Sequence, residues 1–117
     1  MKIIERLSIQ NNGAVVNING FKNLRMLNAS RKFCRLSTIG IEDLQLLEKL
    51  YICENKNITN INCLENLKEL NICDKLQINN DDIDDLGSVE IIYVNEKINI
   101  DKLDISKLNF LCGYRCL

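Results

Sequence analysis

The apolar residues of this chain recur at a spacing that neither an α-helix nor a plain β-strand produces. Between residues 58 and 72 they stand at every third position and then alternate. They are Ile58, Ile61, Leu64, Leu67, Leu70 and Ile72. An amphipathic helix would place them at steps of three and four, and a half-buried strand at steps of two. The spacing predicts a chain that coils around a narrow core and enters a short strand at residues 70–72.

The end of this pattern, apolar-x-x-apolar-x-apolar, recurs along the whole chain. The copies begin at Ile4, Leu24, Leu47, Leu67, Val89 and, in decayed form, Leu108. A nearly constant period of about 20 residues, as between these starts, is typical of repeat proteins. The period makes Ile72 and Val94 equivalent positions in successive copies. Where two copies lie further apart than about 20 residues, we expect the extra residues to lie in loops between the strands.

About 10 residues separate one predicted strand from the next, which is too few for a long crossover helix. We therefore expect 3₁₀ turns, short helices or extended chain between the strands. Alternate strand residues face opposite ways, so Leu50 and Ile52 point into the core while Lys49 and Tyr51 point outward. The predicted core is Leu7, Ile9, Leu24, Leu27, Leu44, Leu47, Leu50, Ile52, Leu64, Leu67, Leu70, Ile72, Val89, Ile92 and Val94.

The pattern resembles the leucine-rich repeat, Leu-x-x-Leu-x-Leu-x-x-(Asn/Cys)-x-Leu, and especially the short repeats of internalin-like proteins. The resemblance covers nearly the whole of residues 1–117, which form one domain of about five to six repeats. It implies an α/β solenoid, a right-handed superhelix with a parallel sheet of five to six short strands. The Asn/Cys position is occupied by Asn12, Lys32, Asn55, Lys75 and Lys97. Lysine departs from the family there, because it offers only donors to the backbone of the turn.

The composition of the chain narrows the classes of function that we expect. The chain has no histidine, its net charge is −1, and it lacks a glycine-rich phosphate loop. We expect no enzyme, cofactor or metal site, and no nucleic-acid or membrane partner. The acidic run at residues 81–85 reads as a solvated loop, as does the basic cluster Arg31, Lys32 and Arg35. With no secretion signal, six cysteines predict reduced thiols and a cytoplasmic protein.

Two cysteines occupy the same place in adjacent repeats. Cys53 follows Ile52 and Cys73 follows Ile72, so their strands place them side by side, about 4.8 Å apart. They form a candidate redox pair that bridges on oxidation. The alternative interpretation is two small, partly buried residues.

The outward strand face is the candidate protein-binding site, since this face is concave in leucine-rich repeats and usually contacts partners. Its predicted contact residues are Met26, Asn28, Lys49, Tyr51, Glu69, Asn71, Ile91, Tyr93, Phe110 and Tyr114. Tyrosine is enriched at binding hot spots because it offers apolar area and a hydroxyl at low entropic cost. The alternative is that the strand face binds no partner and that its scattered apolar residues have no function.

The predicted function is a non-enzymatic protein–protein interaction module. The alternatives are a scaffold that self-associates through its uncapped ends and, less favoured, a thiol-based redox or metal-binding protein. The composition is similar to that of small repeat proteins of viruses, bacteria or protozoa, which would make a host protein the partner.

Overall fold

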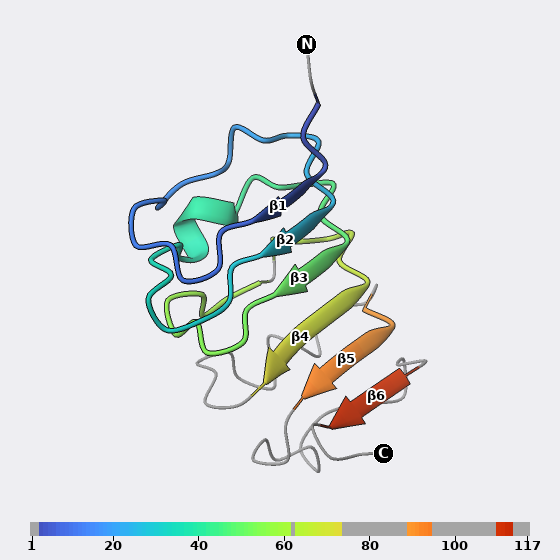
Figure 1. The fold of residues 1–117 in the computed structure, drawn as a ribbon. Coiled ribbons are helices and arrows are strands. Elements are labelled where there is room, and N and C mark those ends of the chain that lie inside the picture. The colour runs from blue at the N-terminus through green and yellow to red at the C-terminus, as the bar shows by residue number, and fades with distance from the viewer. Residues whose placement is uncertain (1–2, 62, 74–88, 95–109, 114–117) are drawn as a thin grey trace.

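The computed structural model describes residues 3–61, 63–73, 89–94 and 110–113. They form one parallel sheet whose strands are ordered as in the sequence, with each strand beside the next (Figure 1). The strands are β1 Arg6–Ser8, β2 Met26–Asn28, β3 Lys49–Tyr51, β4 Glu69–Cys73, β5 Ile91–Val94 and β6 Phe110–Gly113. The helical structure of the described residues is one 3₁₀ turn, η1, at Thr38–Ile41. The predicted parallel sheet is confirmed, and the architecture is compatible with an α/β fold.

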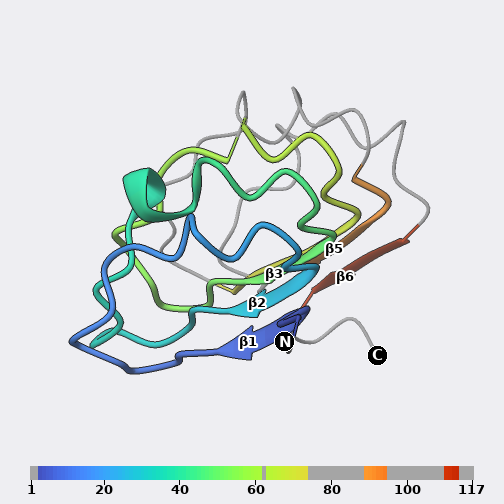
Figure 2. The same cartoon turned by 90° about the horizontal axis from the view of Figure 1, so that it is seen from above.

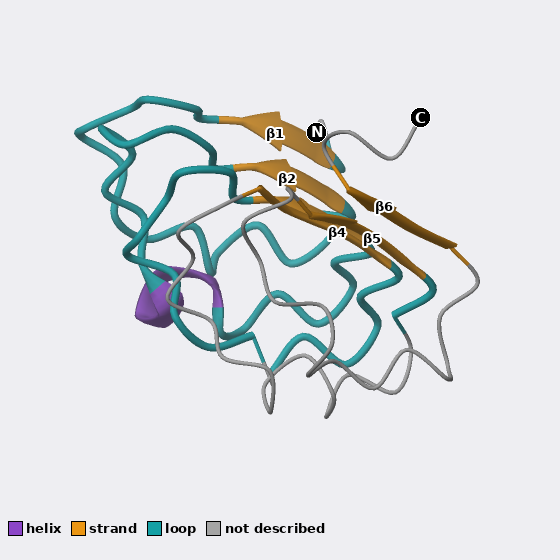
Figure 3. Ribbon diagram, turned by 90° about the horizontal axis from the view of Figure 1, so that it is seen from below, coloured by secondary structure: helices purple, strands orange, loops and turns teal. Residues whose placement is uncertain are grey.

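The strands coincide with the recurring apolar pattern. The residues paired across the whole sheet are Leu7, Leu27, Leu50, Leu70, Ile92 and Leu111. We use "unit" for a strand and the chain that leads to the next strand. Figures 2 and 3 show the strands along one side of the molecule and the connections of the first units on the other. The core lies between these two layers.

The core matches the predicted one wherever side chains are described, except that Leu7 is only partly buried. Leu24, Leu27, Leu47, Leu50, Leu67 and Leu70 have no exposed surface. The sequence-based core omitted several buried residues, all of them in the connections: Ile18, Ala29, Cys34, Leu36, Ile41, Ile58 and Ile61. Burying each of the isoleucine and leucine side chains among them contributes about 1.5–3 kcal/mol. The connections therefore supply one whole wall of the core.

The chain leaves each of the first three strands through the same backbone conformation. Asn11, Arg31 and Glu54, each two residues after the last inward-facing residue, have φ of 60°, 81° and 65°. Non-glycine residues in this left-handed region cost about 1–3 kcal/mol. Bonds to the next unit hold two of them there: Asn11 N donates to Ser30 O at 2.9 Å and Arg31 N to Cys53 O at 2.6 Å.

The position assigned to Asn or Cys is filled in two different ways. Asn55 is buried; its Nδ2 donates to Ala29 O at 2.8 Å and to Leu36 O at 3.2 Å, and its Oδ1 accepts from Asn57 N. Lys32, at the same position one unit earlier, is exposed, since a buried ammonium would lack acceptors. Buried Cys34 and Leu36 follow it in the core. Lys75 and Lys97 lie outside the described residues.

The pairing of β4 with β5 is irregular at one place. The register shifts between Asn71 and Cys73, so that Cys73, and not Ile72, pairs with Val94. An extra residue in one strand is a β-bulge, which bends the strand and increases its twist. Ile72 remains buried, so the shift preserves the core.

Replacing Leu70 by alanine tests the shared core. The side chain is fully buried on the central strand β4, so Leu70→Ala should lower the free energy of unfolding by about 2–5 kcal/mol. The measurement is chemical denaturation, with exposed Lys56→Ala as control. Equal midpoints for the two variants would contradict the assigned register.

Two glycines give a matched pair. A Cβ on Gly40 would overlap Val16 O and lie 2.8 Å from Leu36 Cδ1, whereas one on Gly20 would meet nothing within 4 Å. Gly40→Ala should destabilise the protein by about 1–3 kcal/mol through overpacking, while Gly20→Ala should leave thermal unfolding almost unchanged. A similar loss in both variants would show that backbone flexibility, rather than the close approach of η1 to the first unit, sets the cost.

Candidate functional site

Backbone pairing aligns two rows of residues that run across all the strands. The first row is Arg6, Met26, Lys49, Glu69, Ile91 and Phe110. The second row is Ser8, Asn28, Tyr51, Asn71, Tyr93 and Cys112. Backbone pairing therefore places nine of the ten predicted contact residues in these rows. Tyr114 lies outside the described residues.

Tyr51 stands at the centre of this face. The side chain is half-buried, and its hydroxyl donates to Glu69 Oε2 at 2.5 Å. A short hydrogen bond to a carboxylate is stronger than one between neutral groups. It fixes the phenol ring across β3 and β4, so the aromatic surface of Tyr51 is presented in one orientation.

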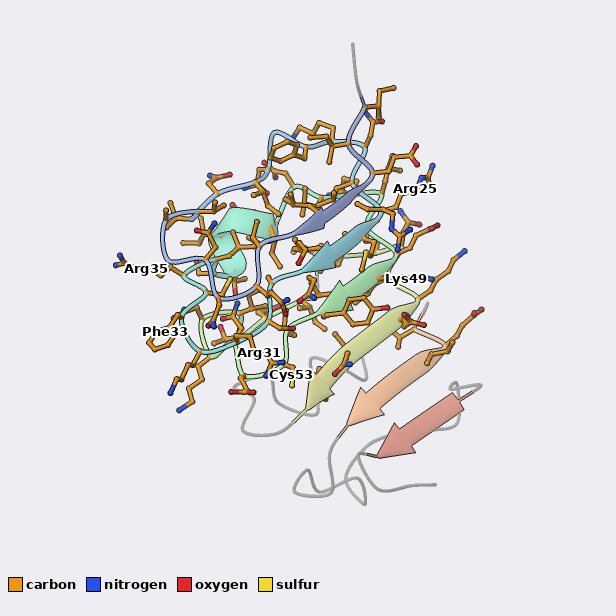
Figure 4. The ribbon with its side chains drawn as sticks, viewed as in Figure 1. Arg25, Arg31, Phe33, Arg35, Lys49 and Cys53 are labelled. Atoms are coloured by element: carbon orange, nitrogen blue, oxygen red, sulfur yellow. The ribbon has the colours of Figure 1, made fainter. Side chains whose placement is uncertain are left out.

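A groove of about 300 Å³ opens on the first three strands. Its lining residues are Glu5, Arg6, Arg25, Met26, Glu48, Lys49 and Tyr51. Figure 4 shows Arg25 and Lys49 at the edge of the sheet where the strands begin. Apolar surface from Met26 and Tyr51 thus lies beside charged groups of both signs, which suits contact with another polypeptide.

Four groove residues are absent from the predicted contact residues. Arg6 lies in the first row, on β1. Glu5, Arg25 and Glu48 each precede their strand by one residue, outside the outward positions that the alternation selects. The same position in the next two units holds Lys68 and Glu90, so the sign of the charge alternates from unit to unit. That alternation at a fixed place in the unit was the signal that could have identified Glu5, Arg25 and Glu48.

These residues form a charge ladder, which we define as Glu5, Arg25, Glu48, Lys68 and Glu90. Arg25 Nη1 lies 3.5 Å from Glu48 Oε2, and Lys68 Nζ lies 3.9 Å from the same oxygen. Main-chain bonds follow the same path: the Glu5 carbonyl accepts from the N–H groups of Arg25 and Met26, and the Arg25 carbonyl from those of Glu48 and Lys49. The ladder therefore follows the edge of the sheet where the groove opens, and main-chain hydrogen bonds hold that edge together.

A basic segment lies at the opposite edge, where the strands end. Arg31 and Arg35 flank Phe33, which is 62% exposed, and Lys32 Nζ stands 5.2 Å from the centre of the Phe33 ring (Figure 4). Arg31 is already paired with Glu54 at 3.2 Å.

The cysteines differ in state. Cys34 and Cys63 are free thiols, the first buried and the second half-buried. Burial raises the pKa of Cys63, with Glu42 and Asp43 adding to the rise, which keeps the thiol protonated and poorly nucleophilic. Cys53 is disulfide-bonded, which differs from the expectation that all six thiols are reduced. The residues that the structure describes contain no cluster of three or more metal-ligating side chains.

Comparison with known proteins does not identify a family: no protein-family model and no curated protein matches the chain. Within the described part of the chain, no helix combines the length and hydrophobicity needed to cross a bilayer.

Reversing one charge tests the ladder. Glu48→Lys would place three cations at successive positions, beside Arg25 and Lys68, and should lower the free energy of unfolding by up to about 1 kcal/mol. Since these groups are partly exposed, the loss should shrink as salt rises from about 10 mM to about 1 M. The control is Glu42→Lys, a reversal at an exposed residue outside the ladder. A loss that does not change with salt would show that the ladder is not electrostatic.

Proposed function

We propose that this chain is a leucine-rich-repeat solenoid that binds another protein through its strand face and catalyses no reaction. The observation that supports binding most directly is the groove on β1–β3, because it combines apolar and charged side chains on a surface formed by regular backbone. Met26 and Tyr51 supply the apolar area. Tyrosine fixed by a neighbour binds with little further loss of side-chain entropy.

Repetition of local geometry supports the solenoid. Three successive units leave their strands through a left-handed residue at the same position, and the Asn55 amide binds carbonyls of the preceding unit. Each unit is thus completed by its neighbour, as in architectures built by stacking.

The charges of the groove favour an acidic segment in the partner. Glu48 already faces Arg25 and Lys68. Among the described residues, neither Arg6 nor Lys49 forms an ion pair with another described residue. Both are exposed and line the groove. A polypeptide with a carboxylate for these cations and an apolar side chain for Met26 and Tyr51 would complement this surface.

A double variant tests the face. Tyr51→Ala with Tyr93→Ala should leave the chain folded, because both residues lie in the second row and outside the predicted core, and should abolish capture of the partner from a cell extract under non-reducing conditions. Phe33→Ala is the matched control, since Phe33 is an exposed aromatic residue away from this face. Circular dichroism and thermal unfolding verify that the variants fold.

Equal capture by the wild-type chain and a folded double variant would contradict binding through the strand face. Recovery of further copies of the chain itself would instead favour the self-associating scaffold. Exposed apolar residues at the β1 end of the sheet, such as Ile3 and Ile4, would belong to its contact surface.

A further inference from the structure

The disulfide of Cys53 needs a partner among the other five cysteines. Cys34 and Cys63 are free, so neither is bonded to Cys53. Cys112 lies on β6, three strands from β3, and three strand spacings amount to about 14 Å. The two cysteines of a disulfide have Cα atoms only about 4.4–6.8 Å apart.

Cys73 is the cysteine that backbone pairing places beside Cys53. β3 and β4 pair with a constant offset: Lys49 with Glu69, Leu50 with Leu70 and Tyr51 with Asn71. The main-chain ladder continues past β3, where Ile52 N donates to Asn71 O at 3.0 Å. The same offset carries Cys53 to Cys73, one strand spacing away.

We propose that Cys53 and Cys73 form a cross-strand thiol–disulfide pair that exchanges with low-molecular-weight disulfides. In the reduced chain, one thiolate attacks a sulfur of the small disulfide. A mixed disulfide forms and one small thiolate leaves. The second cysteine thiolate then attacks the protein sulfur of the mixed disulfide, closes the internal bond and releases the second small thiolate. Two protein thiols are oxidised, one small disulfide is reduced to two thiols, and two protons leave the cysteines.

The position of the pair separates it from the other thiols and connects it to the sheet. Cys53 is half-buried, whereas Cys34 is buried and Cys63 is held protonated by its surroundings. Cys53 also lies next to Glu54, whose carboxylate pairs with Arg31, and Cys73 marks the register shift of β4. Oxidation therefore joins β3 to β4 at the point where regular pairing with β5 is interrupted. This inference is independent of the proposed binding function.

Peptide mapping tests the pairing directly. The oxidised full chain is blocked with N-ethylmaleimide and digested with trypsin, which cuts after Lys49, Lys56, Lys68 and Lys75. The expected product is peptide 50–56 linked to peptide 69–75, with Cys63 alkylated on peptide 57–68. Linkage of 50–56 to 108–115 or to 116–117 would overturn the assignment to Cys73.

Exchange is tested on the reduced chain with oxidised glutathione. Two equivalents of reduced glutathione should be released as the two thiols disappear together. Cys53→Ser and Cys73→Ser should each stop at a stable mixed disulfide, whereas the matched Cys63→Ser should behave like the wild type. The oxidised chain should also melt higher than the reduced chain by on the order of 10 °C. Alkylation of both cysteines after prolonged incubation with oxidised glutathione would overturn the proposal.

Discussion

Parallel register between successive strands is the constraint on which this molecule depends. Leu7, Leu27, Leu50 and Leu70 pair directly across four strands, and the last three have no exposed surface. A one-residue slip in any strand would turn its core residue outward and bring a polar residue in. Burial therefore specifies the register strongly. Everything on the opposite face, including the groove and both outward rows, is positioned as a consequence.

The strand positions could be predicted from the sequence because the buried positions of a strand must be apolar, and this requirement sets the spacing of apolar residues. The outward rows followed for the same reason, since a strand alternates. The filling of the position shared by Lys32 and Asn55 was harder to predict. The buried amide of Asn55 binds backbone carbonyls. The ammonium group of Lys32 could reach such carbonyls only by losing its hydration, and in that unit Cys34 and Leu36 are buried instead. Spacing alone does not reveal which nearby residues will take such a position.

Two other features depended on information that the apolar pattern does not contain. The shift between Asn71 and Cys73 is a property of how two backbones pair, and Ile72 is buried despite it. The charge ladder lies one residue before the strands. Side chains there are exposed or partly exposed, so the apolar pattern does not predict them. The signal of the ladder was the alternation of charge from one unit to the next, which becomes meaningful only once the units are known to be neighbours. The part of the groove formed by Glu5, Arg25 and Glu48 was missed for this reason.

The alternating signs of the ladder bear on how the chain avoids folding incorrectly. Units that look alike risk being assembled out of order, with one skipped or with a unit borrowed from a second molecule. Correct neighbours bring Glu5 beside Arg25 and Glu48 beside Lys68, whereas omitting one unit would bring Glu5 beside Glu48 or Arg25 beside Lys68. Each exposed ion pair contributes only about 0.2–1 kcal/mol, but every wrongly assembled pair of units would lose it and gain a repulsion between like charges. The core leucines cannot distinguish one unit from another, because they are interchangeable. The core thus makes stacking favourable, and the charges at its edge distinguish the adjacent unit from the next one along.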